Sequence, residues 1–246
     1  MIGIFDSGTG GLSVFREIFK LLPTERYIYY SDNANCPYGE KTKEFITDRA
    51  RAISTFLTEQ GADIIVVACN TATAAAISTL REEFPISFIG MEPAVKPAAQ
   101  KTRTGVVGVL ATAGTLKASK YIDIREKWAQ NVKIVEHIGQ GFVELVENGI
   151  LTGPEAESVV EKSIRPLIDA DADTIVLGCT HYPFLADTIM KTAGRPITLI
   201  DPAPAVAKHL LEVMEEKGLV RMDGFSMYLH SSGDPATLEK TYNNLI

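Results

Sequence analysis

The sequence predicts an α/β protein of two pseudo-symmetric lobes, each a mainly parallel sheet covered by helices, with an active site in the cleft between the lobes. Short β-branched runs alternate with segments of helical periodicity, which is typical of parallel sheets with helical cover. The run Ala62–Cys69 also reappears as Ala172–Cys179, at an offset of 110 residues. Two further matches follow the same order: Pro85–Ile89 with Pro196–Ile200, and Gly3–Gly8 with Gly108–Ala113. Buried strands resemble one another in any protein, but three ordered matches favour two lobes of one ancestral design.

The first lobe is expected to begin with a strand at 1–6, followed by a glycine-rich loop that opens a helix. Apolar residues at spacings of three and four predict this helix at 15–22, and Pro23 ends it. The remaining elements expected here are strands at 27–30, 62–69 and 86–89, helices at 46–57 and 74–84, and an irregular loop at 31–40.

The second lobe repeats the alternation. We expect strands at 106–110, 132–135, 172–179 and 198–200, and helices at 116–128, around 142–147, at 154–168 and after the second cysteine. The tail adds a helix from about residue 204, a strand near 225–230 and a helix after Pro235. Because the second lobe is complete by residue 200, we expect the tail to return to the first. The predicted domains are therefore 1–92 with 206–246, and 93–205.

Composition excludes several functions. The chain has 246 residues, a formal charge of −7 and no block of lysine or arginine, whereas nucleic-acid binding needs a clustered basic surface. It opens directly on a strand, with no signal-like segment, and no apolar run approaches the roughly 20 residues that span a bilayer. Three cysteines leave one without a disulfide partner, which fits a reducing compartment. We expect a cytoplasmic protein with neither nucleic-acid nor membrane partners.

The glycine loop Ser7–Gly11 does not match a nucleotide-binding motif. No lysine follows its glycines, and it lacks the third glycine of G-x-G-x-x-G. Backbone N–H groups and the Ser7 hydroxyl at a helix start suit a carboxylate instead. Asp6 would repel an anion, so it is expected to hold an ammonium group or relay a proton, unless it only caps the helix.

Two of the three cysteines are candidates for chemistry. Cys69 and Cys179 each end a strand before a predicted helix, where N–H groups and the helix dipole favour a thiolate. His181, two residues after Cys179, is either an acid or relay or a packed histidine. Cys36 lies in the irregular loop and is expected to be a small buried hydrophobic residue.

Two rival chemistries fit less well. A zinc site built from Cys36, Cys69, Cys179 and His181 lacks the closely spaced cysteine pairs of structural zinc. A cysteine hydrolase needs one nucleophile, which leaves the second cysteine without a task. Two thiols on opposite faces of a carbon do explain a stereochemical inversion, since one removes a proton and the other returns one.

Several blocks of sequence resemble bacterial glutamate racemases, members of the aspartate/glutamate racemase family. The blocks are Asp6–Leu12, Pro37–Gly39, Ala68–Ala72, Gly178–Pro183 and Ser232–Pro235. Aspartate racemases share the paired cysteines but usually lack the D-S-G-x-G-G opening. The resemblance implies a cytoplasmic isomerase, a homodimer without cofactor or metal, that supplies D-glutamate for peptidoglycan synthesis, cell-wall biogenesis and cell shape.

The resemblance also implies a role for each candidate residue. Cys69 would deprotonate D-glutamate with help from Asp6, and Cys179 would deprotonate L-glutamate with help from His181. The amino-acid end of the substrate would be bound by Asp6, Ser7, Asn70, Thr71, Thr112, Thr180 and His181, its side-chain carboxylate by the Tyr38–Gly39 backbone, with Asp32 and Glu147 as supporting acids.

Some alternatives stay open at this point. The substrate could be another small acid such as aspartate, or the chain could be a non-catalytic two-lobed protein that closes on an amino acid. The chain is somewhat short for the family, and the sequence does not decide whether a cell-wall precursor activates it.

Overall fold

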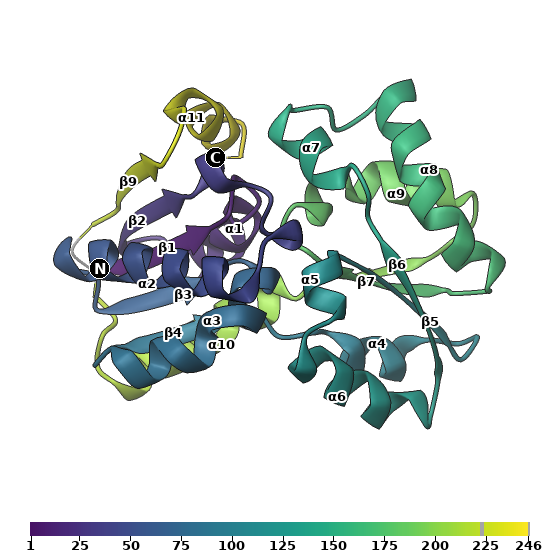
Figure 1. Cartoon of the computed structure of the whole chain (residues 1–246), viewed down its shortest axis with the longest axis horizontal. Helices are drawn as coiled ribbons and strands as arrows, with labels where there is room; N and C mark the ends of the chain where they lie inside the picture. The colour runs from purple at the N-terminus through teal and green to yellow at the C-terminus, as the bar shows by residue number, and fades with distance from the viewer. Residues whose placement is uncertain (222–223, 246) are drawn as a thin grey trace. The chain divides into compact units, whose positions relative to one another are not determined.

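The computed structural model describes residues 1–221 and 224–245 (Figure 1). Contacts between residues divide the chain into two compact units. Unit 1 combines Met1–Met91 with Ala203–Ile246, and unit 2 is the continuous segment Glu92–Pro202. In the described residues, no helix is both long and apolar enough to cross a membrane.

Unit 1 is built on a five-stranded sheet in which every pair of neighbouring strands is parallel. The strand order is β4-β3-β1-β2-β9. The strands are β1 (Ile2–Asp6), β2 (Arg26–Ser31), β3 (Ile64–Val67), β4 (Ser87–Gly90) and β9 (Ser226–Ser231).

Unit 2 contains a second, four-stranded parallel sheet in the order β6-β5-β7-β8. Its strands are β5 (Val106–Ala111), β6 (Lys133–Ile138), β7 (Thr174–Gly178) and β8 (Thr198–Ile200). Read in the opposite direction, this order repeats the β4-β3-β1-β2 part of the first sheet. The prediction of two helix-covered parallel sheets is confirmed.

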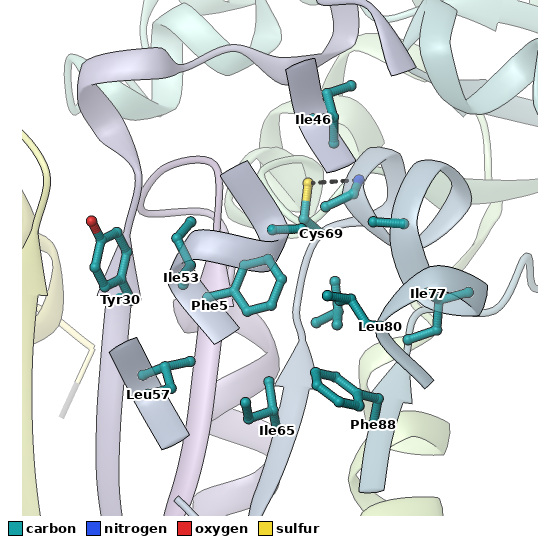
Figure 2. Packing of buried hydrophobic residues seen from close by; sticks show 14 of the residues in the cluster. Phe5, Tyr30, Ile46, Ile53, Leu57, Ile65, Cys69, Ile77, Leu80 and Phe88 are labelled. Atoms are coloured by element: carbon teal, nitrogen blue, oxygen red, sulfur yellow. Dashed lines mark hydrogen bonds between the residues drawn. The ribbon is translucent and has the colours of Figure 1, made fainter. Parts of the chain in front are cut away.

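Helices cover both faces of the sheet in unit 1. Helices α2 (Lys43–Glu59) and α3 (Asn70–Glu83) pack together over one face, and their buried residues form one apolar cluster with Phe5 and Ile65 (Figure 2). Helix α1 (Leu12–Leu21) covers the other face, where the Phe15 ring packs edge-on against Tyr27. The remaining elements are α10 (Ala203–Glu216), which packs on α1, α11 (Pro235–Asn243), which packs on β9, and the 3₁₀ helices η1 (Asn33–Asn35) and η2 (Tyr38–Glu40).

Unit 2 follows the same plan. Its elements are α4 (Val95–Lys101), α5 (Ala113–Leu116), α6 (Ser119–Ala129), α7 (Phe142–Glu147), α8 (Pro154–Asp169), η3 (Tyr182–Leu185) and α9 (Ala186–Ala193). Helices α4 and α6 share an apolar cluster with strands β5 and β7, whereas α8 packs on α9 and β6.

The duplication extends to matched atoms in the two cores. A Cβ atom on Gly3 would lie 3.1 Å from Ala62, 3.2 Å from Ile65 and 3.4 Å from Leu57. A Cβ atom on Gly108 would meet residues at the corresponding positions: Leu167 at 3.1 Å, Ile175 at 3.2 Å and Ala172 at 3.5 Å. In each unit, a glycine therefore lets the first strand lie close to the cysteine strand and to the helix before it.

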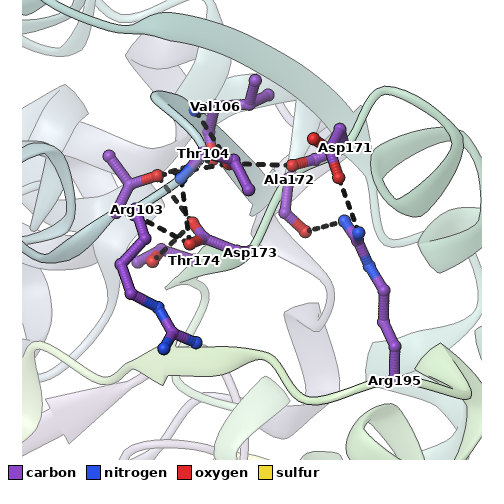
Figure 3. A network of polar contacts seen from close by, with 9 residues as sticks. Arg103, Thr104, Val106, Asp171, Ala172, Asp173, Thr174 and Arg195 are labelled. Atoms are coloured by element: carbon purple, nitrogen blue, oxygen red, sulfur yellow. Dashed lines mark hydrogen bonds and ion pairs between the residues drawn. The ribbon is translucent and has the colours of Figure 1, made fainter.

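An aspartate placed just before each cysteine strand ties that strand to its neighbour. Asp173 accepts hydrogen bonds from the Thr102 hydroxyl at 2.6 Å and from the backbone N–H groups of Arg103 and Thr104, on the segment leading into β5 (Figure 3). Burial acts to raise the pKa of Asp173, but these hydrogen bonds outweigh it and lower the pKa. In unit 1, Asp63 accepts the Met1 ammonium group at 2.6 Å, just before β1.

The structure differs from the expected elements in four places. Helix α3 begins at Asn70, before the expected 74, because the Cys69 sulfur caps it. The expected helix at 116–128 is two helices, since Ala118 is extended. Helix α4 is short and contains a proline, and the sequence analysis missed it. Instead of an irregular loop, 31–40 holds η1 and η2.

Candidate active site

Cys69 lies at the carboxyl end of β3 as the N-cap of α3. Its sulfur accepts a hydrogen bond from the Ala72 N–H group at 3.5 Å, and its side chain is buried (Figure 2). An amide donor and the positive end of a helix dipole both favour a negative charge on this sulfur. The expected thiol at a strand-to-helix junction is therefore present in unit 1.

Asp6 is linked to Cys69 through Ser7. The thiol donates to the Ser7 hydroxyl across 3.8 Å, and that hydroxyl donates to Asp6 Oδ1 across 3.4 Å. The other carboxylate oxygen, Oδ2, accepts the Gly11 N–H group at 2.7 Å. Asp6 thus holds the glycine loop in place through Gly11. It is also the last of three hydrogen-bonded groups, Cys69, Ser7 and Asp6. The sequence analysis assigned Ser7 to the substrate and missed its place in this series.

Two buried residues follow Cys69 in the first turn of α3. Thr71 is buried, and Asn70 is only 7% exposed. Among the described residues, no group forms a hydrogen bond to Asn70 Oδ1. A buried amide oxygen without a partner is costly, so this atom is suited to accept a donor from a ligand.

Asp32 organises the segment between β2 and α2. Arg49 of α2 donates to both carboxylate oxygens, at 2.7 and 2.9 Å, and Asn35 and Tyr38 also donate to this carboxylate. Burial acts to raise the pKa of Asp32, but the hydrogen bonds, led by that from Arg49, outweigh it and lower the pKa. A charged carboxylate on Asp32 therefore fixes η1 and η2 to α2.

Tyr38 and Gly39 belong to the segment that Asp32 fixes. Tyr38 is buried beside Cys69 in the apolar cluster of unit 1, and its burial and the Asp32 charge raise its pKa. The phenol therefore stays protonated as a donor to Asp32. Cys36 is half-buried, so the expectation of a buried hydrophobic residue is wrong: it follows η1 in an extended backbone conformation, outside the packed elements.

Cys179 has different surroundings in unit 2. It follows β7 and is buried, but the next element is the 3₁₀ helix η3 and not an α-helix. Pro183 has no N–H group for an α-helical bond to the Cys179 carbonyl, and the Tyr182 N–H group makes the shorter 3₁₀ bond to it. The expected α-helical N-terminus at Cys179 is therefore wrong.

His181 and Glu147 supply polar groups beside Cys179. His181 Nδ1 lies 3.7 Å from the Cys179 sulfur, and His181 Nε2 lies 2.7 Å from Glu147 Oε1 at the end of α7. His181 is 1% exposed. The geometry is that of a thiol, a base and a carboxylate that orients the base. The sequence analysis had already linked His181 to Cys179, and the structure adds Glu147 as the partner of His181.

Thr180, Thr112 and Tyr182 complete the described surroundings in unit 2. Thr180 is buried, and Thr112 caps α5 by accepting the Thr115 N–H group at 3.3 Å. Tyr182 donates to the Gly139 carbonyl, and burial together with the charge of Cys179 raises its pKa. It therefore supports the site as a neutral phenol.

The sequence analysis missed Arg49 and Tyr182. Arg49 lies three residues after Ile46 on α2, and a cation so close to the apolar stripe of a helix could have suggested a buried acid as its partner. No feature of the sequence distinguishes Tyr182 from an ordinary core tyrosine.

Comparison with known proteins gives one consistent result. Residues 2–210 match the family model described as Asp/Glu/Hydantoin racemase. A glutamate racemase of Roseiflexus sp. (strain RS-1) is 48% identical over 221 residues, covering 89% of this chain and 81% of the relative.

Solved structures show the same relationship. Glutamate racemase RacE1 from Bacillus anthracis has a TM-score of 0.89 at 32% identity, covering 99% of this chain and 92% of that chain. Escherichia coli glutamate racemase, in complex with L-glutamate and the activator UDP-MurNAc-Ala, has a TM-score of 0.88 at 34% identity, covering 99% and 94%. The prediction of an amino-acid racemase is confirmed, and the chain belongs to the Asp/Glu/Hydantoin racemase family.

Proposed function

We propose that this protein interconverts L- and D-glutamate without a cofactor, using Cys69 and Cys179 as the two bases. The observation that carries the proposal is that each unit holds one buried thiol connected to its own carboxylate. In unit 1 the carboxylate is Asp6, reached through Ser7, and in unit 2 it is Glu147, reached through His181.

In the proposed reaction, the Cys69 thiolate removes the Cα proton of D-glutamate and the Cys179 thiol protonates the opposite face, which gives L-glutamate. The reverse reaction begins at Cys179. Turnover of D-glutamate leaves Cys69 protonated and Cys179 ionised, which is the reverse of the starting state. The enzyme must therefore exchange protons before it accepts D-glutamate again. Two series of groups offer routes for that exchange, because neighbouring groups in each lie within hydrogen-bonding reach. They are Cys69, Ser7 and Asp6 in unit 1, and Cys179, His181 and Glu147 in unit 2.

The proposed contacts to glutamate use polar groups near the two thiols. Asn70 Oδ1, buried and without a partner there, suits the substrate ammonium. Ser7, Thr71, Thr112 and Thr180 offer hydroxyls to the amino-acid end. The Tyr38–Gly39 backbone, fixed through Asp32, would bind the distal carboxylate and so favour glutamate over the shorter aspartate.

We further propose that the product D-glutamate serves peptidoglycan synthesis in the cytoplasm and that the enzyme is a homodimer. The resemblance to bacterial glutamate racemases supports these assignments. None of the cysteines forms a disulfide within the described residues, which agrees with a reducing compartment.

Deuterium exchange in heavy water tests the proposal. Protein freed of metal by a chelator and of pyridoxal compounds should convert L-glutamate to an equal mixture of enantiomers and incorporate deuterium at Cα. Proton NMR measures the loss of the Cα signal, and chiral chromatography measures the enantiomers. Absence of exchange under these conditions would rule out the proposed function, and faster exchange with L-aspartate would reassign the substrate.

A further inference from the structure

The end of β9 and the turn after it contact the segment that follows β2. The turn comprises residues 231–234, about 200 positions along the chain from η1. It contains the first three residues of the Ser232–Pro235 block that the sequence analysis noted, to which the proposed reaction gives no task.

Asn33 is the centre of this contact. Its Oδ1 atom accepts hydrogen bonds from the Ser231 hydroxyl at 2.7 Å and from the Gly233 N–H group at 2.9 Å. Its Nδ2 group donates to the Asp234 carbonyl at 2.9 Å. The Asn33 side chain therefore joins η1 to three of the four residues of the turn.

Ser232 adds two bonds between the same segments. Its hydroxyl accepts the Ala34 N–H group at 3.2 Å, and its own N–H group donates to the Ser31 carbonyl at 2.9 Å. Gly233 is equally constrained, because a Cβ atom there would lie 2.9 Å from Asn33 Oδ1 and 3.3 Å from the Ala34 nitrogen. The turn thus fits closely against η1.

The contact continues to Tyr38 through Asp32. Asn35, the last residue of η1, donates to Asp32 Oδ1 at 3.1 Å, and Tyr38 of η2 donates to the other oxygen of the same carboxylate. A shift of η1 therefore acts on the carboxylate that holds Tyr38. The distance along the chain from Asn33 to Tyr38 is short, and both ends are anchored.

We propose that the turn 231–234 is a positioning element of the active site, with Asn33 as its positioning residue. It holds η1, and through Asp32 it sets the Tyr38–Gly39 backbone in the place where that backbone binds the distal carboxylate of the substrate. The inference rests on the proposed function, because it takes glutamate as the ligand of that backbone.

Asn33→Ala in the full-length protein tests the inference. The variant loses all three side-chain hydrogen bonds, so amide hydrogen exchange in residues 33–40 should accelerate by about tenfold. KM for glutamate should rise about tenfold while kcat changes less than about threefold, because a contact distant from the reacting carbon is made equally in the ground and transition states. Asn131→Ala, at an exposed asparagine of unit 2, should change neither quantity.

A second pair of variants guards against loss of folding. Ser232→Ala removes the hydroxyl that accepts the Ala34 N–H group and hydrogen-bonds the Asp32 carboxylate. Ser232→Thr keeps the hydroxyl and should restore the wild-type KM. Unchanged exchange and unchanged KM in Asn33→Ala, or in Ser232→Ala if the first variant does not fold, would overturn the inference, as would a fall in kcat alone. A wild-type protein inactive toward glutamate would instead reject the proposed function, and the exchange measurement would still show whether the turn holds the segment.

Discussion

A different side chain connects each thiol to its carboxylate. Between Cys69 and Asp6 lies the Ser7 hydroxyl, which can pass a proton only by receiving and donating one at the same time. Between Cys179 and Glu147 lies the His181 imidazole, which can hold a proton by itself. The Cys179 side can therefore store a proton on a neighbouring group, whereas the Cys69 side must pass it on.

Single cysteine variants separate the two thiols. Cys69→Ser and Cys179→Ser should each lower the racemisation rate by about 10²- to 10⁴-fold, because both directions use both sulfurs and a serine hydroxyl is a far weaker base at neutral pH. Elimination from a glutamate analogue with a good β-leaving group needs only deprotonation. Cys69→Ser should thus still consume the L analogue, and Cys179→Ser the D analogue, as measured by release of the leaving group.

Each variant serves as the control for the other, since both substitutions remove one sulfur atom from equivalent strands. Equal loss of both enantiomers in both variants would contradict the assignment of one thiol to each face. Unchanged circular dichroism spectra would exclude unfolding as the cause.

At the scale of elements, the segment from η1 to η2 depends on the ion pair of Asp32 and Arg49, in which the acid is fully buried and the arginine side chain is 29% exposed. Asp32→Asn keeps the shape of the side chain but leaves the Arg49 guanidinium without its counter-ion. Removing one partner of a buried pair costs about 3–5 kcal/mol, so we expect the free energy of unfolding to fall by about 3 kcal/mol at pH 7. Asp48→Asn, on the same helix with its acid 75% exposed, should change it by less than about 0.5 kcal/mol.

The same pair predicts a pH dependence. The folded-state pKa of Asp32 is lowered from its unfolded value near 4. Its contribution to stability is therefore present above about pH 4 and lost as the pH falls through the folded-state pKa. Urea unfolding at pH 7, 5, 4 and 3 should show a steeper loss of stability for the wild type than for Asp32→Asn, and parallel curves would contradict the assigned pKa shift.

The sequence predicted elements well where local pattern and tertiary packing agree. The β-branched run 64–67 predicts a buried strand, and the apolar stripe of α2 predicts a helix; both predictions are confirmed. Helices η1 and η2 could not be predicted in this way, because they depend on side chains from α2 and from the distant turn at 231–234. The position of Cys69 at a helix start was predictable from its strand, but the 3₁₀ geometry after Cys179 depends on Pro183.

At the scale of the whole molecule, the two units have separate cores with matched positions. Ile65 and Ile175 are both fully buried and lie at equivalent places beside Gly3 and Gly108. Ile65→Ala and Ile175→Ala should each cost about 2–5 kcal/mol. Amide hydrogen exchange should rise in the strands of the mutated unit and stay unchanged in the other, and equal loosening of both units would mean that the chain unfolds as one cooperative structure.

The sequence Pro-Ala-Val occurs at 93–95 and again at 204–206, and at both places the chain passes from one unit to the other. The first follows β4 and leads into α4, which packs on β5 and β7 of unit 2, and the second follows β8 and lies in α10, which packs on α1 of unit 1. Each repeat thus gives its last helix to the other, so neither is complete alone. An ancestor with a single repeat would have needed a second copy to cover its sheet, and each copy would have brought one thiol. Gene fusion of such a dimer would leave the helices exchanged, as they are here, and would let the groups beside each thiol evolve separately into a hydroxyl and an imidazole.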